Sequence, residues 1–143
     1  MTINQLSIFI ENKEGKLADL TTTLANEGID IRAMSVADTQ DFGILRLIVS
    51  DHDHAIEVLK NAGCVVSVTQ VLAVAIPDTP GSLAKVSHLL ADNHISIEYM
   101  YAFITRRQES AYVVFRVADN ALAADILVSN GVKLATKADI DAL

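Results

Sequence analysis

The amino-acid sequence predicts an α+β fold built from two copies of one βαββαβ unit, and three observations support this prediction. The chain repeats itself, because residues 5–34 match residues 71–100 without a gap, with Gly15 on Gly81 and Met34 on Met100. Apolar residues alternate with period two in some segments and recur with helical spacing in others. Hydrophobic residues make up 51% of the 143-residue chain, which is enough for a packed core.

After Met100 the second copy carries two extra residues near Arg106 and Arg107, which we interpret as a solvated hairpin tip. The match then resumes, and Gly63 falls on Gly131. A repeat of this length, shifted only at one turn, indicates a duplication. The predicted domains are therefore residues 1–70 and 71–143.

The elements of the first copy follow from these periodicities in order. Leu6, Ile8 and Ile10 alternate along a first strand, and Leu17, Leu20 and Leu24 recur at helical spacing. The remaining elements are two strands, a helix and a last strand, at residues 29–38, 43–50, 52–62 and 64–70. Their counterparts in the second copy are residues 95–105, 110–118, 120–130 and 132–137.

The helix ends and the junction between the copies also carry signals. Gly28 follows the first helix and Gly63 the second, where a glycine with positive φ is expected. His94 stands where the second copy should have its equivalent of Gly28, so we expect that helix to end differently. Residues 64–76 contain neither Gly nor Pro, so the copies are predicted to join directly through β structure. A βαββαβ unit places its helices on one face of an antiparallel sheet, which is a ferredoxin-like arrangement.

Composition and charge exclude several classes of partner. The net charge of −7 and the pI near 4.9 argue against nucleic acid, which needs clustered Lys and Arg. The N-terminus lacks the features of a signal peptide, and no apolar stretch is long enough to span a membrane. The predicted location is the cytoplasm. Cys64, which lies in an apolar run, is read as a buried hydrophobe rather than as a reactive thiol.

The loop before the first helix of each copy is the strongest candidate for a binding site. The first turn of a helix presents unpaired N–H groups and a partial positive charge, to which a carboxylate can bind. Gly15 and Gly81 let the backbone approach a ligand closely. Asn12 and Asp78 can accept a hydrogen bond from an ammonium group, or they can act as ordinary N-caps of the helices.

The segments Ile10–Leu17 and Ile76–Leu83, each followed by an amphipathic helix and an Ile-x-Ile sequence, resemble the ACT-domain pattern. Glu14 departs from the pattern, which has Pro at the place of Pro80. The resemblance implies two ACT-like units that pair through their second strands into an eight-stranded antiparallel sheet with helices on one face. It also implies a non-catalytic regulatory or sensor protein that binds a free amino acid between the units, without a cofactor. A regulatory subunit of a separate amino-acid-metabolism enzyme is the alternative, and a homodimer is compatible with both.

The candidate ligand-binding residues combine the two loops with the second strands. They are Asn12, Lys13, Gly15, Lys16, Leu17, Asp30, Asp78, Thr79, Gly81, Ser82, Leu83, Ser96, Met100 and Tyr101. In the family pattern a loop of one unit faces the start of the second strand of its partner. This pattern pairs Asn12 with Ser96 and Asp78 with Asp30, and the second pair would favour amino acids with an extra positive charge.

The other polar clusters give weaker signals. Asp51-His52-Asp53-His54 opens a helix, so capping explains it better than a metal site does. The segment from Met100 to Phe103 fits either core packing or a pocket wall. Neither a nucleophile–base pair nor a phosphate-binding loop is recognisable, which places an enzyme last among the candidate functions.

Overall fold

The computed structural model describes residues 1–38, 41–104 and 110–143. Arg106 and Arg107, the predicted hairpin tip, lie outside the described residues. The chain divides into two compact units, a first unit of Asn4–Thr69 and a second unit of Gln70–Leu143 with Met1–Ile3. Each unit is described by itself.

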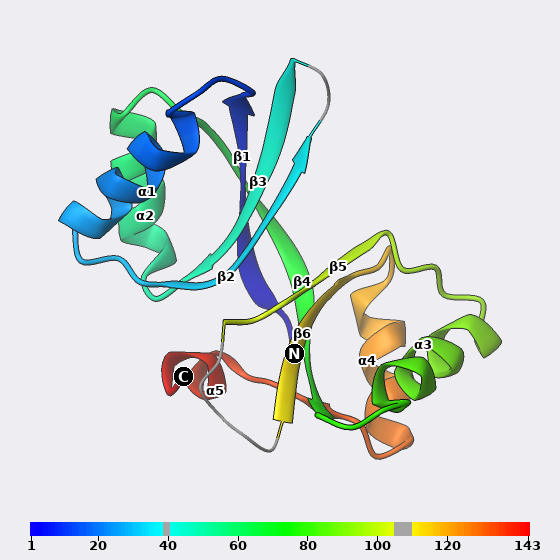
Figure 1. Cartoon of the computed structure of the whole chain (residues 1–143). Helices are drawn as coiled ribbons and strands as arrows, with labels where there is room; N and C mark the ends of the chain where they lie inside the picture. Colours follow the sequence, from blue (N-terminus) through cyan, green and yellow to red (C-terminus); the bar gives the residue numbers. More distant parts are fainter. Residues whose placement is uncertain (39–40, 105–109) are drawn as a thin grey trace. The chain divides into compact units, whose positions relative to one another are not determined.

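The first unit follows the predicted βαββαβ order (Figure 1). Its elements are β1 (Ile3–Glu11), α1 (Lys16–Asn26), β2 (Ile31–Asp38), β3 (Phe42–Val49), α2 (His52–Asn61) and the first part of β4 (Val65–Pro77). The second unit continues through the rest of β4 with α3 (Ser82–Asp92), β5 (Tyr99–Ala102), β6 (Ser110–Arg116), α4 (Asn120–Ser129), β7 (Lys133–Leu134) and α5 (Lys137–Asp141).

The described strands form an antiparallel sheet of seven strands, in the order β2-β3-β1-β4-β6-β5, with β7 paired to β4. The prediction of eight strands was therefore wrong by one. The reason is that the last strand of the first copy and the first strand of the second copy are one uninterrupted strand, β4. The absence of Gly and Pro from residues 65–76 explains this continuity, because nothing in that segment interrupts an extended chain.

The expected pairing of the second strands with each other does not occur among the described strands. Strand β2 pairs with β3 and β5 pairs with β6, and both end the strand order. The copies are instead connected through β4, so the second strands keep one edge each without a neighbour in the strand order.

Each unit has its own hydrophobic core between its helices and one face of its strands (Figure 1). In the first unit Leu6 and Ile8 of β1 contribute to this core together with Leu59 of α2, and all three are fully buried. In the second unit Leu72 and Leu127 occupy the matching positions and are also fully buried. The apolar face that the period-two pattern predicted is therefore the core face in both copies.

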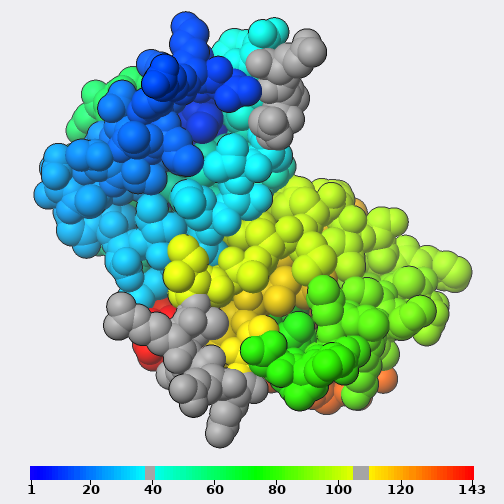
Figure 2. Space-filling model, viewed as in Figure 1, coloured from blue at the N-terminus to red at the C-terminus, as the bar shows by residue number. Residues whose placement is uncertain are grey.

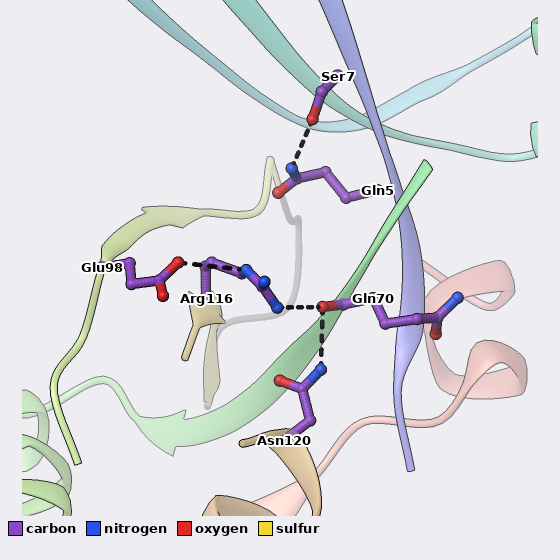
Figure 3. Close-up of polar contacts among 6 residues, drawn as sticks. All are labelled: Gln5, Ser7, Gln70, Glu98, Arg116 and Asn120. Atoms are coloured by element: carbon purple, nitrogen blue, oxygen red, sulfur yellow. Dashed lines mark hydrogen bonds and ion pairs between the residues drawn. The ribbon is translucent and has the colours of Figure 1, made fainter. Parts of the chain in front are cut away.

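Polar contacts hold β4 at Gln70, the first residue of its second-unit part (Figure 3). The carbonyl oxygen of Gln70 accepts hydrogen bonds from Nη1 of Arg116 at 3.3 Å and from Nδ2 of Asn120 at 3.0 Å. Nε of Arg116 also lies 3.3 Å from a carboxylate oxygen of Glu98. These contacts connect β4, β6, the start of α4 and the segment before β5. In the first unit the side chain of Gln5, which is fully buried, donates a hydrogen bond to the hydroxyl of Ser7 at 3.0 Å.

The prediction that α3 ends differently from α1 was wrong. His94 adopts a positive φ of 58°, close to the 67° of Gly28 in the first copy. In both copies the residue after this position donates its N–H back to the helix, with Ile29 bonding to Leu24 at 3.0 Å and Ile95 to Leu90 at 2.9 Å. The two helices thus end in the same way, and the hydrogen-bonded turn tolerates the strain of a non-glycine residue.

The C-terminal segment is the other departure. The predicted strand at 132–137 is shortened to β7, and the helix α5 follows it. Thr136 and Asp139 cap this helix reciprocally, since the Thr136 hydroxyl accepts from the N–H of Asp139 while the Asp139 carboxylate accepts from the N–H of Thr136. This capping box stops the strand and starts the helix.

Candidate ligand-binding loops

The β1–α1 loop and the β4–α3 loop have the same backbone conformation. Gly15 precedes α1 with φ of 83°, and Gly81 precedes α3 with φ of 90°. Both values lie in the left-handed region, which a residue with a Cβ rarely adopts. The repeated glycine of the sequence is therefore required by the turn that leads into each helix.

These two helices differ from the other described helices in how they begin. The N-caps Asp51 of α2, Asp119 of α4 and Thr136 of α5 each accept a hydrogen bond from a backbone N–H of the first turn. No side chain caps α1 or α3 in this way. Asn12 and Asp78 are therefore not the N-caps of their helices, and this removes the capping interpretation of the two residues.

The missing caps leave backbone N–H groups available at the start of both helices. In α3 the N–H of Ser82 bonds to the carbonyl of Thr79 at 3.2 Å, but the structure gives Leu83 and Ala84 no acceptor within the described chain. In α1 the same holds for Leu17 and Ala18. Two adjacent N–H groups at a helix N-terminus, with the positive end of the helix dipole, form a suitable carboxylate site.

Ala18 and Ala84 were absent from the sequence-derived site because an alanine side chain gives no chemical signal. The repeat did contain the information, since Ala18 falls on Ala84. Their contribution is the backbone N–H, which follows from helix geometry once the missing cap is known.

The first loop carries charged side chains. Asn12 is exposed, and its backbone N–H bonds to the carbonyl of Asp41 at 3.0 Å. Nζ of Lys13 lies 2.6 Å from a carboxylate oxygen of Glu11. This hydrogen bond, together with the charge of Lys13, lowers the pKa of Glu11 below its ordinary value, and the same contact raises the pKa of Lys13. Lys16 and Leu17 complete the loop as exposed residues.

The second loop is held by hydroxyl groups rather than by charges. The Thr79 and Ser82 hydroxyl oxygens lie 2.8 Å apart in a hydrogen bond that spans the turn. Asp78 is exposed, and Leu83 keeps 39% of its surface accessible. Figure 2 shows the segments around both loops at the molecular surface, the first in blue and the second in green.

The predicted second-strand residues occupy different environments. Asp30 precedes β2, and its carboxylate lies 2.9 Å from Nη1 of Arg32. Its backbone also bonds to Ser50, whose hydroxyl accepts from the Asp30 N–H at 3.0 Å. This ion pair reduces the net negative charge that the sequence suggested at Asp30. Within the first unit Asp30 lies at the α1–β2 end, whereas Asn12 lies at the β1–α1 end, so the unit does not bring the two together.

Ser96, Met100 and Tyr101 are placed in the second unit. Ser96 is exposed and lines a depression of about 660 Å³ with His94 and residues of α3. Met100 and Tyr101 lie on β5, where Met100 is 38% exposed and Tyr101 is 9% exposed. Tyr101 is therefore packed into the structure and contributes little surface to an open site.

The remaining candidates of the sequence have structural roles. His52 contacts the side chain of Asn4 at 2.9 Å, and His54 contacts Glu27 at 3.2 Å. Across residues 1–38, 41–104 and 110–143 no cluster of His, Cys, Asp and Glu is arranged to hold a metal ion. Burial raises the pKa of the Cys64 thiol, which disfavours the reactive thiolate. Among the described helices none has the length and apolar composition needed to cross a membrane.

Two βαββαβ units, each with a glycine-led helix start, define a tandem ferredoxin-like class of protein. The profile of the ACT domain pair family matches residues 1–143, so the chain belongs to this family. ACT domains are regulatory, amino-acid-binding domains, as the sequence resemblance implied.

Solved structures with the same fold include one of high similarity. Protein BT0572 from Bacteroides thetaiotaomicron is 40% identical over 100% of this chain and 98% of its own, with a TM-score of 0.92. The regulatory subunit of aspartate kinase from Thermus thermophilus is 17% identical over 88% of this chain and 90% of its own, with a TM-score of 0.63. The corresponding subunit from Thermus flavus is 20% identical over the same shares, with a TM-score of 0.61. A search of curated proteins gave no match.

Proposed function

We propose that the protein is a non-catalytic regulatory protein that binds a free amino acid at its glycine-led loops. The observation that supports this most directly is the unused pair of N–H groups at the start of α1 and of α3. A structural helix start would gain about 1 kcal/mol from a side-chain cap, and α2 and α4 have such caps. In α1 and α3 the equivalent position is free for a ligand.

The chemistry of an amino acid fits this position. Its α-carboxylate would accept hydrogen bonds from the N–H groups of Leu83 and Ala84, where the helix dipole adds about 0.3–1 kcal/mol. Its α-ammonium would donate to Asp78, whose exposed carboxylate has no recorded partner in the described chain. The first loop offers Asn12 in place of Asp78, so the two sites differ by one negative charge at this position.

A second ACT unit is needed to close each site. The ligand interface predicted from the family lies between a loop and the start of a second strand. Because β2 and β5 end the strand order, we propose that this second strand comes from another copy of the chain. Contacts of Asn12 with Ser96, and of Asp78 with Asp30, then require β2 of one chain to lie beside β5 of another. The Arg32–Asp30 ion pair weakens the preference for a cationic side chain in the second of these sites.

Backbone NMR spectroscopy tests the carboxylate position directly. We expect titration with each of the twenty amino acids to shift the amide signals of Leu17, Ala18, Leu83 and Ala84 for a chemically narrow subset. The amide of Leu122, which is the capped N–H at the start of α4, is the matched control and should not shift. A ligand that binds without moving the α1 or α3 amides would contradict the proposed site.

A regulatory subunit of a separate enzyme is the second candidate function. It is favoured by the size of the fold, since the chain matches 90% of the length of the aspartate kinase regulatory subunits. This candidate predicts that a purified amino-acid-metabolism enzyme from the same cell is inhibited by an amino acid only when the chain is added. Inhibition that is unchanged by the chain would contradict it.

A further inference from the structure

The second unit contains a cavity that the amino-acid loops do not explain. Its volume is about 460 Å³, which lies in the range of small-molecule sites. The walls come from the end of β4, the first turns of α3, the start of β6 and the turn between α4 and β7. Ile76, Val86 and Val132 provide its apolar surface.

The described charges that line this cavity are positive. Lys85 of α3 and Lys133 of β7 are the ionisable residues among its described lining, which contains no acidic side chain. Within the described part of the chain Lys85 forms no ion pair. Nζ of Lys133 lies 3.9 Å from Oδ1 of Asp139, and Oδ2 of the same carboxylate accepts two hydrogen bonds from Thr136. Both ammonium groups are thus weakly compensated within the described structure.

The first unit has a cavity at the equivalent place, with a volume of about 330 Å³. Its walls are the end of β1, α1 and the turn between α2 and β4. Glu11 and Asp19 line it together with Lys16, so its formal charge is negative. The duplication therefore supplies an internal comparison in which the backbone is shared and the lining side chains differ.

Most of the charge differences between the two cavities make the second one more positive. Lys85 occupies the position of Asp19, and Pro77 occupies the position of Glu11. Lys133 occupies the position of Val65. Two acids are lost and two lysines are gained in the second copy, whereas Lys16 is replaced by a serine. A need for general solubility would not concentrate these changes around one cavity in a protein whose net charge is −7.

We propose that this cavity of the second unit, called here the lysine pocket (Ile76, Val86, Val132, Lys85 and Lys133), binds a small organic anion. A carboxylate of the ligand lies between the ammonium groups of Lys85 and Lys133, and its short hydrocarbon part packs on the three apolar side chains. The pocket borders the β4–α3 loop at Ser82, but Lys85 and Lys133 are not part of the proposed amino-acid site, so the proposal does not depend on that site. The hydroxyl of Ser82, which also lines the pocket, is already bonded to Thr79.

Succinate and inorganic phosphate, at equal ionic strength, are the probes that test the proposal. We expect succinate to shift the backbone amides of Ile76, Val86 and Val132 in a saturable way, while phosphate, which has no apolar part, binds at least fivefold more weakly. Raising the NaCl concentration should weaken succinate binding, because the attraction is electrostatic and partly exposed.

Substitution of the two lysines provides the decisive comparison. Lys85→Gln and Lys133→Gln should each weaken succinate binding at least fivefold, and the double variant should abolish saturation. Asp19→Asn, the matched change in the first-unit cavity, should leave succinate binding unchanged. Both lysines are exposed, so the variants are expected to fold. The proposal is overturned if succinate does not bind, if phosphate binds as tightly as succinate, or if the double variant binds like the parent protein.

Discussion

Replacing Gly81 by alanine separates the ligand-binding role of a glycine from its conformational role, and Gly63 is the matched control. Both residues have positive φ, 90° for Gly81 and 83° for Gly63, and a Cβ added at either would meet no atom within 4 Å. Because neither site has a steric clash, only the left-handed backbone is penalised, by about 1–2 kcal/mol. For a chain of this size each kcal/mol lowers Tm by about 2–4 °C. Gly81→Ala and Gly63→Ala should therefore lose similar stability.

Their effects on ligand binding should differ. Gly81 is the N-cap of α3 beside the unpaired N–H groups, whereas Gly63 follows α2 and donates its N–H to the carbonyl of Lys60 at 2.9 Å. We expect Gly81→Ala to weaken amino-acid binding at least tenfold, which corresponds to about 1.4 kcal/mol, and Gly63→Ala to change it by less than twofold. Calorimetric unfolding and isothermal titration measure the two effects on the same samples. Equal losses of affinity in two folded variants would refute the reasoning.

Three further predictions concern stability. Asp119→Ala should lower the free energy of unfolding by about 1 kcal/mol, because it removes an N-cap. Asp78→Ala should change the free energy of unfolding by less than about 0.5 kcal/mol. A comparable loss for both variants in urea unfolding would show that Asp78 does cap its helix. Leu90→Ala should lower it by about 2–5 kcal/mol, because Leu90 is fully buried, and a smaller loss would show that the core is loosely packed. Lys13→Ala should raise the pKa of Glu11 towards its ordinary value in an NMR titration, because the hydrogen bond and the charge of Lys13 lower that pKa. The pair stabilises the folded state above the ordinary carboxyl pKa, and this effect is lost as the pH falls through the lowered value. An unchanged Glu11 pKa would show that the contact is not formed in solution.

The repeat in the sequence predicted most of the fold because each copy repeats the same apolar faces. Leu6 and Leu72 illustrate this, since both are fully buried on the helix-facing side of their strands. The uninterrupted β-prone segment also predicted the direct joining of the copies. It did not predict the strand count, because sequence alone does not tell whether an extended segment serves as two adjacent strands or as one shared strand.

Two other features depended on local hydrogen bonds that the comparison of the two copies did not predict. His94 adopts a glycine-like φ because Ile95 bonds to Leu90, so the turn around it outweighs its intrinsic preference. Thr136 and Asp139 have capping-box spacing, which indicates the start of helix α5. The repeat favours a longer last strand, which conflicts with this capping signal.

The candidate site was predicted in part for the same reason. The glycine positions followed from the repeat, and their positive φ values explain them. The availability of the N–H groups did not follow, because Asn12 and Asp78 have the residue types of good caps and only the structure shows that they do not cap. The position of Lys85 and Lys133 at one cavity was not predicted either, because they are far apart in sequence and neither belongs to a recognisable motif.

A thermal-shift screen of the twenty free amino acids tests the central claim of amino-acid binding most directly. A ligand that binds only the folded state at 100 times its Kd adds about 2.7 kcal/mol of stability, which corresponds to a rise in Tm of about 5–11 °C for a chain of this size. The account predicts such a rise for one amino acid or for a chemically related few, and its loss in the Gly15→Ala/Gly81→Ala double variant. A screen in which no amino acid raises Tm at millimolar concentration, or in which the double variant responds like the parent protein, would contradict it.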